Sequence, residues 1–347
     1  MLRSGKSEGV VVSWLGEGWD GSVSQERPAR VHATNAVLCL ANPKGVVTRG
    51  MTNRGILRSR LFFALIVLAS VSLLSGCYFA IGCDPCPYCD RPEVVSDRML
   101  FVNWSNFVTV AKLDGTGGGG LNVGGLLDDP IGIALDLGAG KMYVSNYGNS
   151  TLVKANLDGT DAEVLSLPVN SGCNGVGLDD TAGKLYIANN SSDSITVVTL
   201  EDMSWTVHAV ATLERPTDVA VDPVAGKMYI TNDNDTVTVA NLDGSGGSSM
   251  DLNSVLDSPL GIALDLPNRK MYIVQNGGVA TANLDGTGGA LLPGTTGGRG
   301  LALDLAAREI YVTRADNLIT ITNLDGTGAE NIVAHPVSIP SGIALAP

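Results

Sequence analysis

The chain has 347 residues and a formal net charge of −13 at pH 7. Beyond position 76 it holds 13 Lys and Arg against 31 Asp and Glu, about −18, which argues against nucleic acid or an anionic lipid surface as the main partner. The 43 glycines, with few charged (16%) and few aromatic residues (5%), are typical of many short strands joined by tight turns.

The N-terminal part contains a predicted signal peptide. Residues 61–74 form an apolar run of 14 residues, too short to span a bilayer but typical of the hydrophobic region of a signal peptide, and three arginines precede it. Met51 lies 26 residues before Cys77, a normal signal-peptide length. We therefore interpret 51–76 as the signal peptide and expect residues 1–50 to be a non-translated or artefactual extension.

The apolar run ends in Leu74-Ser75-Gly76-Cys77, which resembles a bacterial lipobox. The resemblance implies that the chain is cut just before Cys77 and that this cysteine is lipidated. A lipid chain would anchor the protein to a membrane of the bacterial cell envelope, facing the periplasm or the cell surface. The alternative is an ordinary signal peptide followed by a chance cysteine.

Residues 77–97 form a short cysteine-rich linker. Cys83, Cys86 and Cys89 have a spacing compatible with zinc or iron–sulfur ligation, but no fourth cysteine or histidine lies nearby and export implies an oxidising compartment. With Cys77 lipidated, these three and Cys173 make four cysteines, an even number that favours two disulfides. Metal ligation and free thiols remain the alternatives, and we expect no metal or other cofactor.

A sixfold repeat covers residues 98–347. Successive copies open 43 residues apart, except that the last follows after 39, at Arg98, Lys141, Lys184, Lys227, Lys270 and Glu309. A period in the low forties with several short strands in each copy predicts a six-bladed β-propeller with four-stranded blades.

Each copy contains the same phrases. A small–large alternation, as in 132–136, predicts the innermost strand, since one face carries Gly or Ala and can pack in the crowded centre. The Asp that ends it is followed seven residues later by a predicted core tyrosine, at Tyr143, Tyr186, Tyr229, Tyr272 and Tyr311. An Asp-Gly turn follows the third strand in five of the copies, and a weaker fourth strand comes next.

The phrases GIALD, KMYVSN and ANLDGT, in this order, resemble the YWTD repeat of low-density-lipoprotein-receptor class B propellers, and the Tyr-Val-Ser-Asn and Tyr-Ile-Thr-Asn variants approach bacterial YVTN repeats. The resemblance spans 98–347 and implies a six-bladed propeller. No copy has the Trp of the YWTD repeat, and Asn replaces its Asp in most copies.

The register of the repeat predicts how the ring closes. The domain begins on a second strand, 99–103, and ends on a first strand, 342–346. We therefore expect the C-terminal strand to complete the N-terminal blade from inside, which hides an open sheet edge. Such a closed ring is predicted to be monomeric.

Binding is expected on one face of the ring, which we call the variable face. It consists of the loops between second and third strands and the segments that lead into the first strands, where the spacing differs between copies. The candidate ligand-binding residues on this face are Trp104, Tyr147, Asn174, Arg215, Asp218, Arg299, Arg314 and Asp316.

Asp218 stands at the position where the other five copies have the glycine that opens the innermost strand. It is interpreted either as a ligand contact or as a cap of the following turn. The recurring Asp136, Asp179, Asp222, Asp265 and Asp304 are instead expected to bind backbone N–H groups of their hairpins.

The sequence favours a binding function over an enzymatic one. His208 and His335, the two histidines beyond residue 76, fall in predicted outer strands, and no Ser-His-Asp spacing, HExxH or phosphate loop occurs. We therefore expect a membrane-anchored scaffold that binds a protein ligand. The alternative is a metal-assisted hydrolase, lactonase or lyase at the channel mouth, where Asp218 and Asn174 have suitable positions.

Overall fold

The computed structural model describes residues 39–41, 47–49, 97–165 and 172–346. Two units are distinguished, Met1–Cys83 and Asp84–Pro347. In the first, β1 (Cys39–Ala41) pairs antiparallel with β2 (Val47–Arg49). Cys77, Cys83, Cys86, Cys89 and the predicted signal peptide lie outside the described residues, as does most of the predicted linker.

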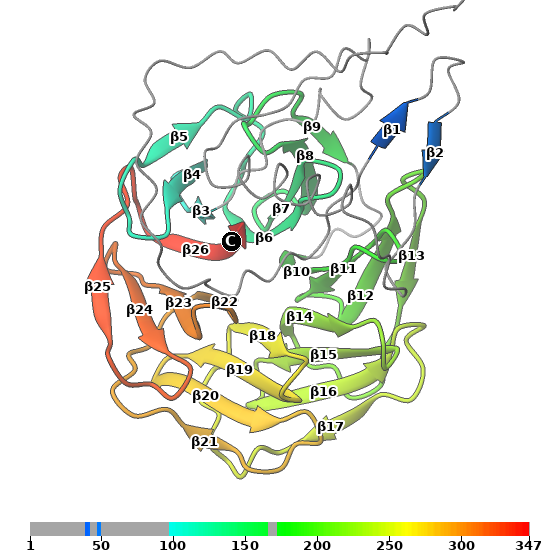
Figure 1. Cartoon of the computed structure of the whole chain (residues 1–347). Coiled ribbons are helices and arrows are strands. Elements are labelled where there is room, and N and C mark those ends of the chain that lie inside the picture. The colour runs from blue at the N-terminus through cyan, green and yellow to red at the C-terminus, as the bar shows by residue number, and fades with distance from the viewer. Residues whose placement is uncertain (1–38, 42–46, 50–96, 166–171, 347) are drawn as a thin grey trace, which may run out of the picture. The chain divides into compact units, whose positions relative to one another are not determined.

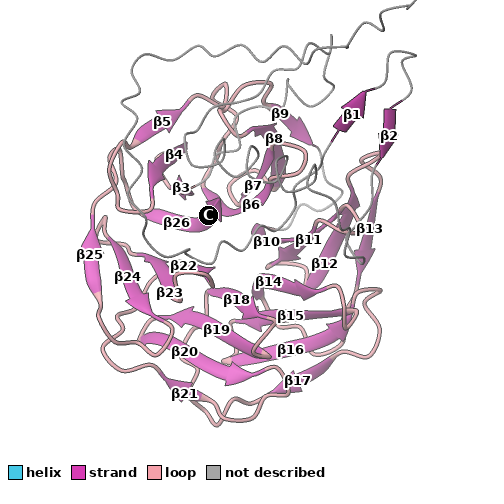
Figure 2. Ribbon diagram, viewed as in Figure 1, coloured by secondary structure: helices cyan, strands magenta, loops and turns pink. Residues whose placement is uncertain are grey.

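Six four-stranded antiparallel sheets make up the described part of the second unit, and they surround a common axis (Figures 1 and 2). This confirms the six-bladed all-β propeller. Blade 1 contains β26 (Pro340–Ala346), β3 (Arg98–Asn103), β4 (Phe107–Lys112) and β5 (Gly119–Leu121). Blade 2 contains β6 (Pro130–Asp136), β7 (Lys141–Asn146), β8 (Thr151–Asn156) and β9 (Glu163–Leu165). Blade 3 contains β10 (Cys173–Asp179), β11 (Lys184–Asn189), β12 (Ser194–Thr199) and β13 (Trp205–His208).

The other three blades follow the same order from the axis outward. Blade 4 contains β14 (Pro216–Asp222), β15 (Lys227–Asn232), β16 (Thr236–Asn241) and β17 (Ser248–Met250). Blade 5 contains β18 (Gly261–Asp265), β19 (Lys270–Gln275), β20 (Gly278–Asn283) and β21 (Ala290–Leu291). Blade 6 contains β22 (Gly300–Asp304), β23 (Glu309–Thr313), β24 (Ile319–Asn323) and β25 (Glu330–Ile332). The described residues contain no helix that is long and apolar enough to cross a membrane.

The ring is closed by the C-terminal strand, as the register of the repeat predicts. β26 pairs antiparallel with β3, with Ile343 opposite Phe101 and Ala346 opposite Arg98. The first strand of each blade, which we call the inner strand, contacts the inner strands of both neighbouring blades, and β26 lies between β22 and β6. The two ends of the propeller sequence therefore share one sheet.

The hydrophobic core is divided among the six interfaces between neighbouring blades. Each interface holds one cluster of buried side chains drawn from the two blades that meet there. Both faces of each second strand contribute to the core. In β7, Met142 packs with residues of blade 1, and Tyr143 packs with residues of blade 3. All five repeat tyrosines are buried, which confirms their predicted place in the core. Burial raises the pKa of Tyr143 and of Tyr186 to about 12.

The recurring aspartates cap the hairpins between first and second strands, as expected. Asp136 Oδ1 accepts the N–H of Ala139 at 2.8 Å, and Asp222 Oδ1 accepts that of Ala225 at 2.9 Å. The same bond recurs at Asp179, Asp265 and Asp304. The aspartates of the Asp-Gly sequences close the predicted tight turns, where hydrogen bonds from Thr116 hold the pKa of Asp114 below its ordinary value.

Closure makes the C-terminal strand as important for stability as any internal inner strand. Ile343 in β26 and Ile133 in β6 occupy the same repeat position and are each 7% exposed. We expect Ile343→Ala and Ile133→Ala to lower the free energy of unfolding by similar amounts, about 2–4 kcal/mol, because each leaves a cavity at a blade interface. Chemical denaturation of the full chain measures both.

The control is Val224→Ala, since Val224 is 97% exposed and its truncation should change stability by less than about 0.5 kcal/mol. A C-terminal strand that does not close the ring would make Ile343→Ala behave like this control.

Candidate functional site

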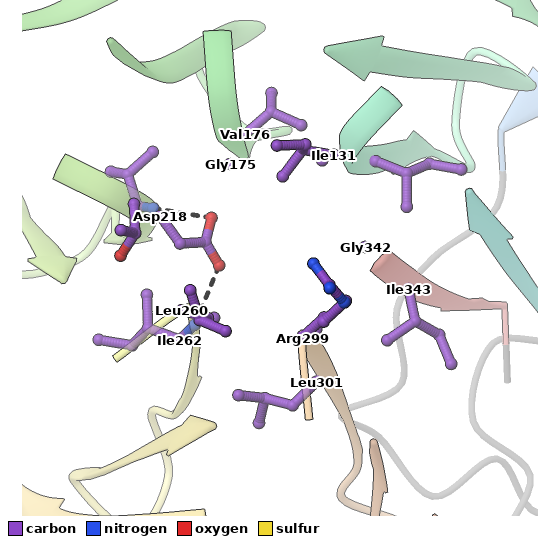
Figure 3. A pocket seen from close by; sticks show the side chains of 16 residues that line it. Ile131, Gly175, Val176, Asp218, Leu260, Ile262, Arg299, Leu301, Gly342 and Ile343 are labelled. Atoms are coloured by element: carbon purple, nitrogen blue, oxygen red, sulfur yellow. Dashed lines mark hydrogen bonds between the residues drawn. The ribbon is translucent and has the colours of Figure 1, made fainter. Parts of the chain in front are cut away.

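The inner strands surround a cavity of about 120 Å³ at the axis, lined by residues from all six blades. Glycine and aliphatic residues form most of its wall. Asp218 and Arg299 are the two charged side chains among the described lining residues, and both point into the cavity (Figure 3). The structure therefore brings together two of the predicted site residues, which come from different blades.

Asp218, in β14, joins three blades. Its Oδ1 accepts the N–H of Val219 at 2.8 Å, and its Oδ2 accepts the N–H of Ile262, in blade 5, at 2.9 Å. A Cβ on Gly175, in blade 3, would overlap the carboxylate. The side chain caps the backbone that follows it and also faces the cavity, and its role as a ligand contact stays a prediction. Burial raises its pKa to about 7, although the two N–H bonds act in the opposite direction.

Arg299 directly precedes β22 and reaches the cavity from blade 6. Its guanidinium carbon lies 4.2 Å from the centroid of the Trp104 indole ring, a cation–π stack between blades 6 and 1. Its Nε is buried without a hydrogen-bond partner among the described residues. Desolvation lowers the pKa of Arg299 from its ordinary value.

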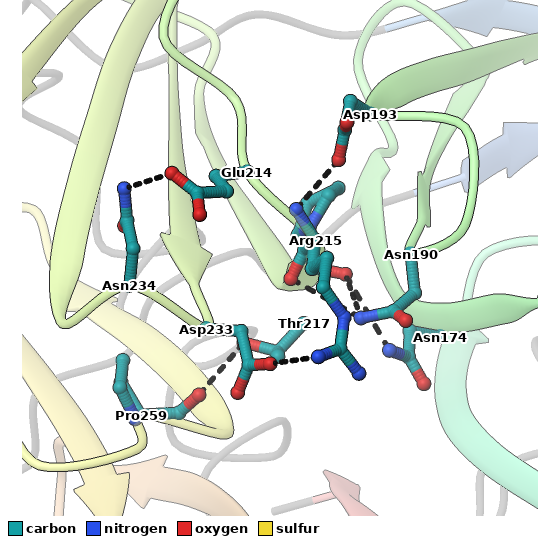
Figure 4. A network of polar contacts seen from close by, with 10 residues as sticks. Asn174, Asn190, Asp193, Glu214, Arg215, Thr217, Asp233, Asn234 and Pro259 are labelled. Carbon is teal, nitrogen blue, oxygen red and sulfur yellow. Dashed lines mark hydrogen bonds and ion pairs between the residues drawn. The ribbon is translucent and has the colours of Figure 1, made fainter.

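Arg215 is held on the variable face by its own surroundings. Its Nη1 lies 2.7 Å from Asp233 Oδ2, and its backbone N–H donates to Asp193 Oδ1 at 2.6 Å (Figure 4). Its carbonyl oxygen accepts a bond from Asn190 Nδ2 at 3.1 Å. Arg215 is not one of the residues that line the cavity, and its charge is paired with Asp233 in the loop between β15 and β16.

Arg314 replaces a structural amide. In blades 1, 2, 4 and 5 the side-chain oxygen of an Asn or Gln at the end of the second strand accepts an N–H from the segment leading into the inner strand of the same blade: Asn103, Asn146, Asn232 and Gln275. In blade 6, Arg314 donates instead to Thr296 Oγ1 at 2.7 Å and makes two bonds to Asp316, at 2.6 and 3.0 Å. Arg314 and Asp316 therefore satisfy each other.

The remaining candidates lie apart from the cavity. Asn174 is buried in β10 and donates to the carbonyl of Pro216 at 3.4 Å, which joins blades 3 and 4. Tyr147 is exposed in the loop after β7, and a Cβ on Gly172 would lie 2.8 Å from its ring. Asn174 is thus a blade contact, whereas Tyr147 contributes an exposed aromatic to the variable face.

A hydrogen bond repeated between blades fixes the loops of the variable face. A side-chain oxygen in the loop between second and third strands accepts the N–H of a residue just before the next inner strand, and we call this bond the blade latch. The five latches join Asn106 to Asp129, Ser150 to Gly172, Asp193 to Arg215, Asp235 to Ser258 and Asn317 to Ile339, over 2.6–2.9 Å. All ten residues have positive φ.

The histidines and the described cysteine lie away from the cavity. His208 ends the outer strand β13, as predicted, and its Nδ1 is 2.7 Å from the carbonyl oxygen of Asp243. His335 lies in the connection after β25, not in the strand itself. Cys173 is buried between blades 2 and 3 without a disulfide partner among the described residues, and burial raises its thiol pKa to about 11. The predicted disulfides remain a prediction.

Two hydroxyl residues near the axis escaped the sequence analysis. Thr217 Oγ1 donates to the carbonyl of Pro259, and Ser341 Oγ donates to that of Pro130, each over 2.8 Å and each to the next blade. The sequence signal that could have identified them is the residue just before the strand-opening glycine position. This residue changes from copy to copy: Ile131, Asn174, Thr217, Leu260, Arg299 and Ser341.

Titration of Asp218 should be visible in the stability of the protein. The folded pKa of about 7 exceeds the ordinary value of 3.8, so the folded state retains this proton between those pH values while the unfolded state loses it. The free energy of unfolding of the wild type, minus that of Asp218→Asn, should therefore fall from about pH 4 to pH 7 and then level off. The slope is at most about 1.4 kcal/mol per pH unit.

Urea unfolding of both proteins across this pH range measures the difference. Subtraction removes the opposite contribution of the turn aspartates, such as Asp114, whose pKa values are lowered. Two parallel profiles would show that Asp218 titrates in the folded protein as it does in the unfolded chain.

Neither a protein-family model nor a curated protein matches the sequence. The fold, in contrast, is similar to solved structures. One is a nidogen/laminin complex, with a TM-score of 0.64 and 17% identity over 71% of this chain and 97% of that chain. Two are lyases: a streptogramin B lyase (TM-score 0.55, 15% identity, 71% and 82% covered) and the virginiamycin B lyase of Staphylococcus aureus (0.53, 12%, 69% and 82%). At these identities the likeness concerns the fold alone, and at that level the YWTD-like and YVTN-like propeller resemblance is confirmed.

Proposed function

We propose that the protein is a lipid-anchored lipoprotein of the bacterial cell envelope whose propeller binds a protein ligand through the variable face. The observation that carries the proposal is the stack of the exposed Trp104 on the partly buried Arg299 at that face. Trp, Tyr and Arg are enriched among the residues that dominate the energy of protein interfaces. The stack holds a large aromatic surface and a cation in one fixed arrangement.

Other residues extend this surface. The backbone N–H of Trp104 donates to the carbonyl of Ile339 at 3.3 Å, and the Ile339 side chain is itself exposed. Tyr147 adds a second exposed aromatic from blade 2. The blade latches already order the backbone of these loops, so little conformational entropy is lost when a partner binds.

The fold neighbours fit both a binding and a lyase function, since they include a nidogen/laminin complex and two lyases. The binding function is favoured by where the proton-transfer groups lie. His208 ends an outer strand and His335 lies beyond β25, so neither approaches Asp218 at the axis. At the cavity, Asp218 would have to act both as the acid and as the base, or a group of the ligand would have to take one of these roles.

The anchor is tested by Cys77→Ser in cells. We expect the wild type to fractionate with membranes and the variant to appear in the soluble envelope fraction, because the lipid chains attach to this thiol. Cys173→Ser is the control and should leave fractionation unchanged, since Cys173 lies in the propeller core. Equal membrane recovery of all three proteins would contradict lipidation at Cys77.

The binding surface is tested by Trp104→Ala in the full chain. Trp205→Ala is a matched control, because Trp205 is exposed to a similar degree, 47% against 40%, but lies on the outer strand β13. In affinity capture from envelope extract, we expect Trp104→Ala to lower recovery of the bound protein at least about tenfold and Trp205→Ala to leave it unchanged. Equal recovery with all three proteins would remove the stack from the interface.

A further inference from the structure

Two departures from the repeat meet at one cavity. Asp218 replaces the glycine found in the other five copies, and Arg299 is the one charged residue at the position before it. They come from blades 4 and 6, yet both point into the same space at the axis (Figure 3). Nothing in the assembly of a blade requires either charge, because the other copies form the same inner strand without them.

The positive charge of Arg299 has no carboxylate partner among the described residues. The ion pairs found there use Lys154, Arg215, Arg269 and Arg314. Arg299 is instead fixed by its stack on Trp104, with its Nε buried and without a hydrogen-bond partner. An unpaired guanidinium held in this way is suited to a planar anion such as a carboxylate, which it can bind with two parallel bonds.

Asp218 provides a complementary group across the cavity. Each of its oxygen atoms accepts one backbone N–H, and a carboxylate oxygen has capacity for a further bond. Because its pKa is about 7, the group at neutral pH is present both as a carboxylate and as a neutral acid. A ligand that donates a hydrogen bond or carries a positive charge would stabilise the carboxylate.

The size and wall of the cavity limit what fits. Its volume is about 120 Å³, and apolar cavities of about 150 Å³ hold benzene, so an occupant of about five or six non-hydrogen atoms is appropriate. Each inner strand pairs on one side only, which leaves a strand edge towards the axis. The backbone N–H of Ile262 donates to Asp218, so backbone groups of these strand edges bind polar partners in the cavity.

We propose that the cavity at the axis binds a small amino or hydroxy acid. The carboxylate of this ligand pairs with the Arg299 guanidinium, and its amino or hydroxyl group donates to Asp218. This site shares Arg299 with the proposed protein interface but does not rest on it, and it would stand if no protein bound at Trp104. Isothermal titration calorimetry of the full chain at pH 7 and low salt tests it, with glycine and glycolate as probes. Acetate lacks the donor, and glycinamide lacks the carboxylate.

We expect glycine or glycolate to bind more tightly than acetate, and glycinamide not to bind. Arg299→Met should weaken binding at least about tenfold, because the charged fork is lost. Asp218→Asn should reduce the preference for the donor-bearing probe over acetate. Arg308→Met is the control, since Arg308 is exposed in the hairpin of blade 6, away from the cavity, and should bind like the wild type.

Thermal unfolding checks that each variant is folded. If Arg299→Met does not fold, Arg299→Lys replaces it, because it keeps the charge, loses the bidentate geometry and should still weaken binding several-fold. No binding of either acid up to about 10 mM would overturn the proposal. Binding that survives loss of the guanidinium would do so as well.

To separate free small molecules from the C-terminus of a protein, N-acetylglycine is added as a probe. It keeps a carboxylate next to an N–H donor but is larger than glycine. Weaker binding of N-acetylglycine supports a small free acid. Tighter binding than glycine and glycolate would overturn the proposal in favour of a chain terminus.

Discussion

The close approach of the six inner strands at the axis is the constraint on which the rest of the molecule depends. A Cβ at Gly132 would lie 3.0 Å from the Cα of Gly175, and one at Gly342 would lie 3.1 Å from the Cα of Gly132. Backbones this close leave no room for a side chain that points from the strand-opening position towards the next blade. The strand-opening position therefore takes glycine, unless its side chain turns into the channel. Asp218 does so, and its carboxylate then occupies the space over Gly175.

This constraint reaches the variable face through hydrogen bonds. In blades 1, 2, 4 and 5 the segment just before the inner strand has two of its backbone N–H groups bound, one by the amide that ends the second strand and one by the latch from the preceding blade. The backbone of the face is thus set by the ring. Sequence differences there change which side chains are presented. Recognition on such a surface depends on side chains such as Trp104 and Tyr147.

The fold was predictable because its causes recur in every copy. The constant spacing of seven residues from Asp to Tyr defines the first hairpin. The closure follows because the propeller sequence begins on a second strand and ends on a first strand. The pairing of individual candidates was not predictable. Arg215 and Arg314 look like free cations in the sequence, but acidic residues of the same blades form ion pairs with them. The stack of Arg299 on Trp104 joins opposite ends of the propeller sequence, a contact that only closure creates.

The latches were missed for a different reason. Their acceptors are Asn, Ser or Asp, and their donors are backbone N–H groups of unrelated residues, so no single letter recurs. What recurs is a left-handed backbone on both sides, which the sequence does not display directly. The same hydrogen bond and backbone conformation therefore recur in several copies although the residue types differ.

Charge limits which ligands reach the channel. The chain beyond residue 76 carries about −18, so its long-range field repels anions, and this field is screened beyond about 8 Å at physiological salt. A polyanion would meet that repulsion over its whole length, whereas a small acid meets little of it until it contacts Arg299. An amino acid has no net charge at neutral pH and so avoids the repulsion. The same negative field that disfavours large anions is thus compatible with a small zwitterion between Arg299 and Asp218.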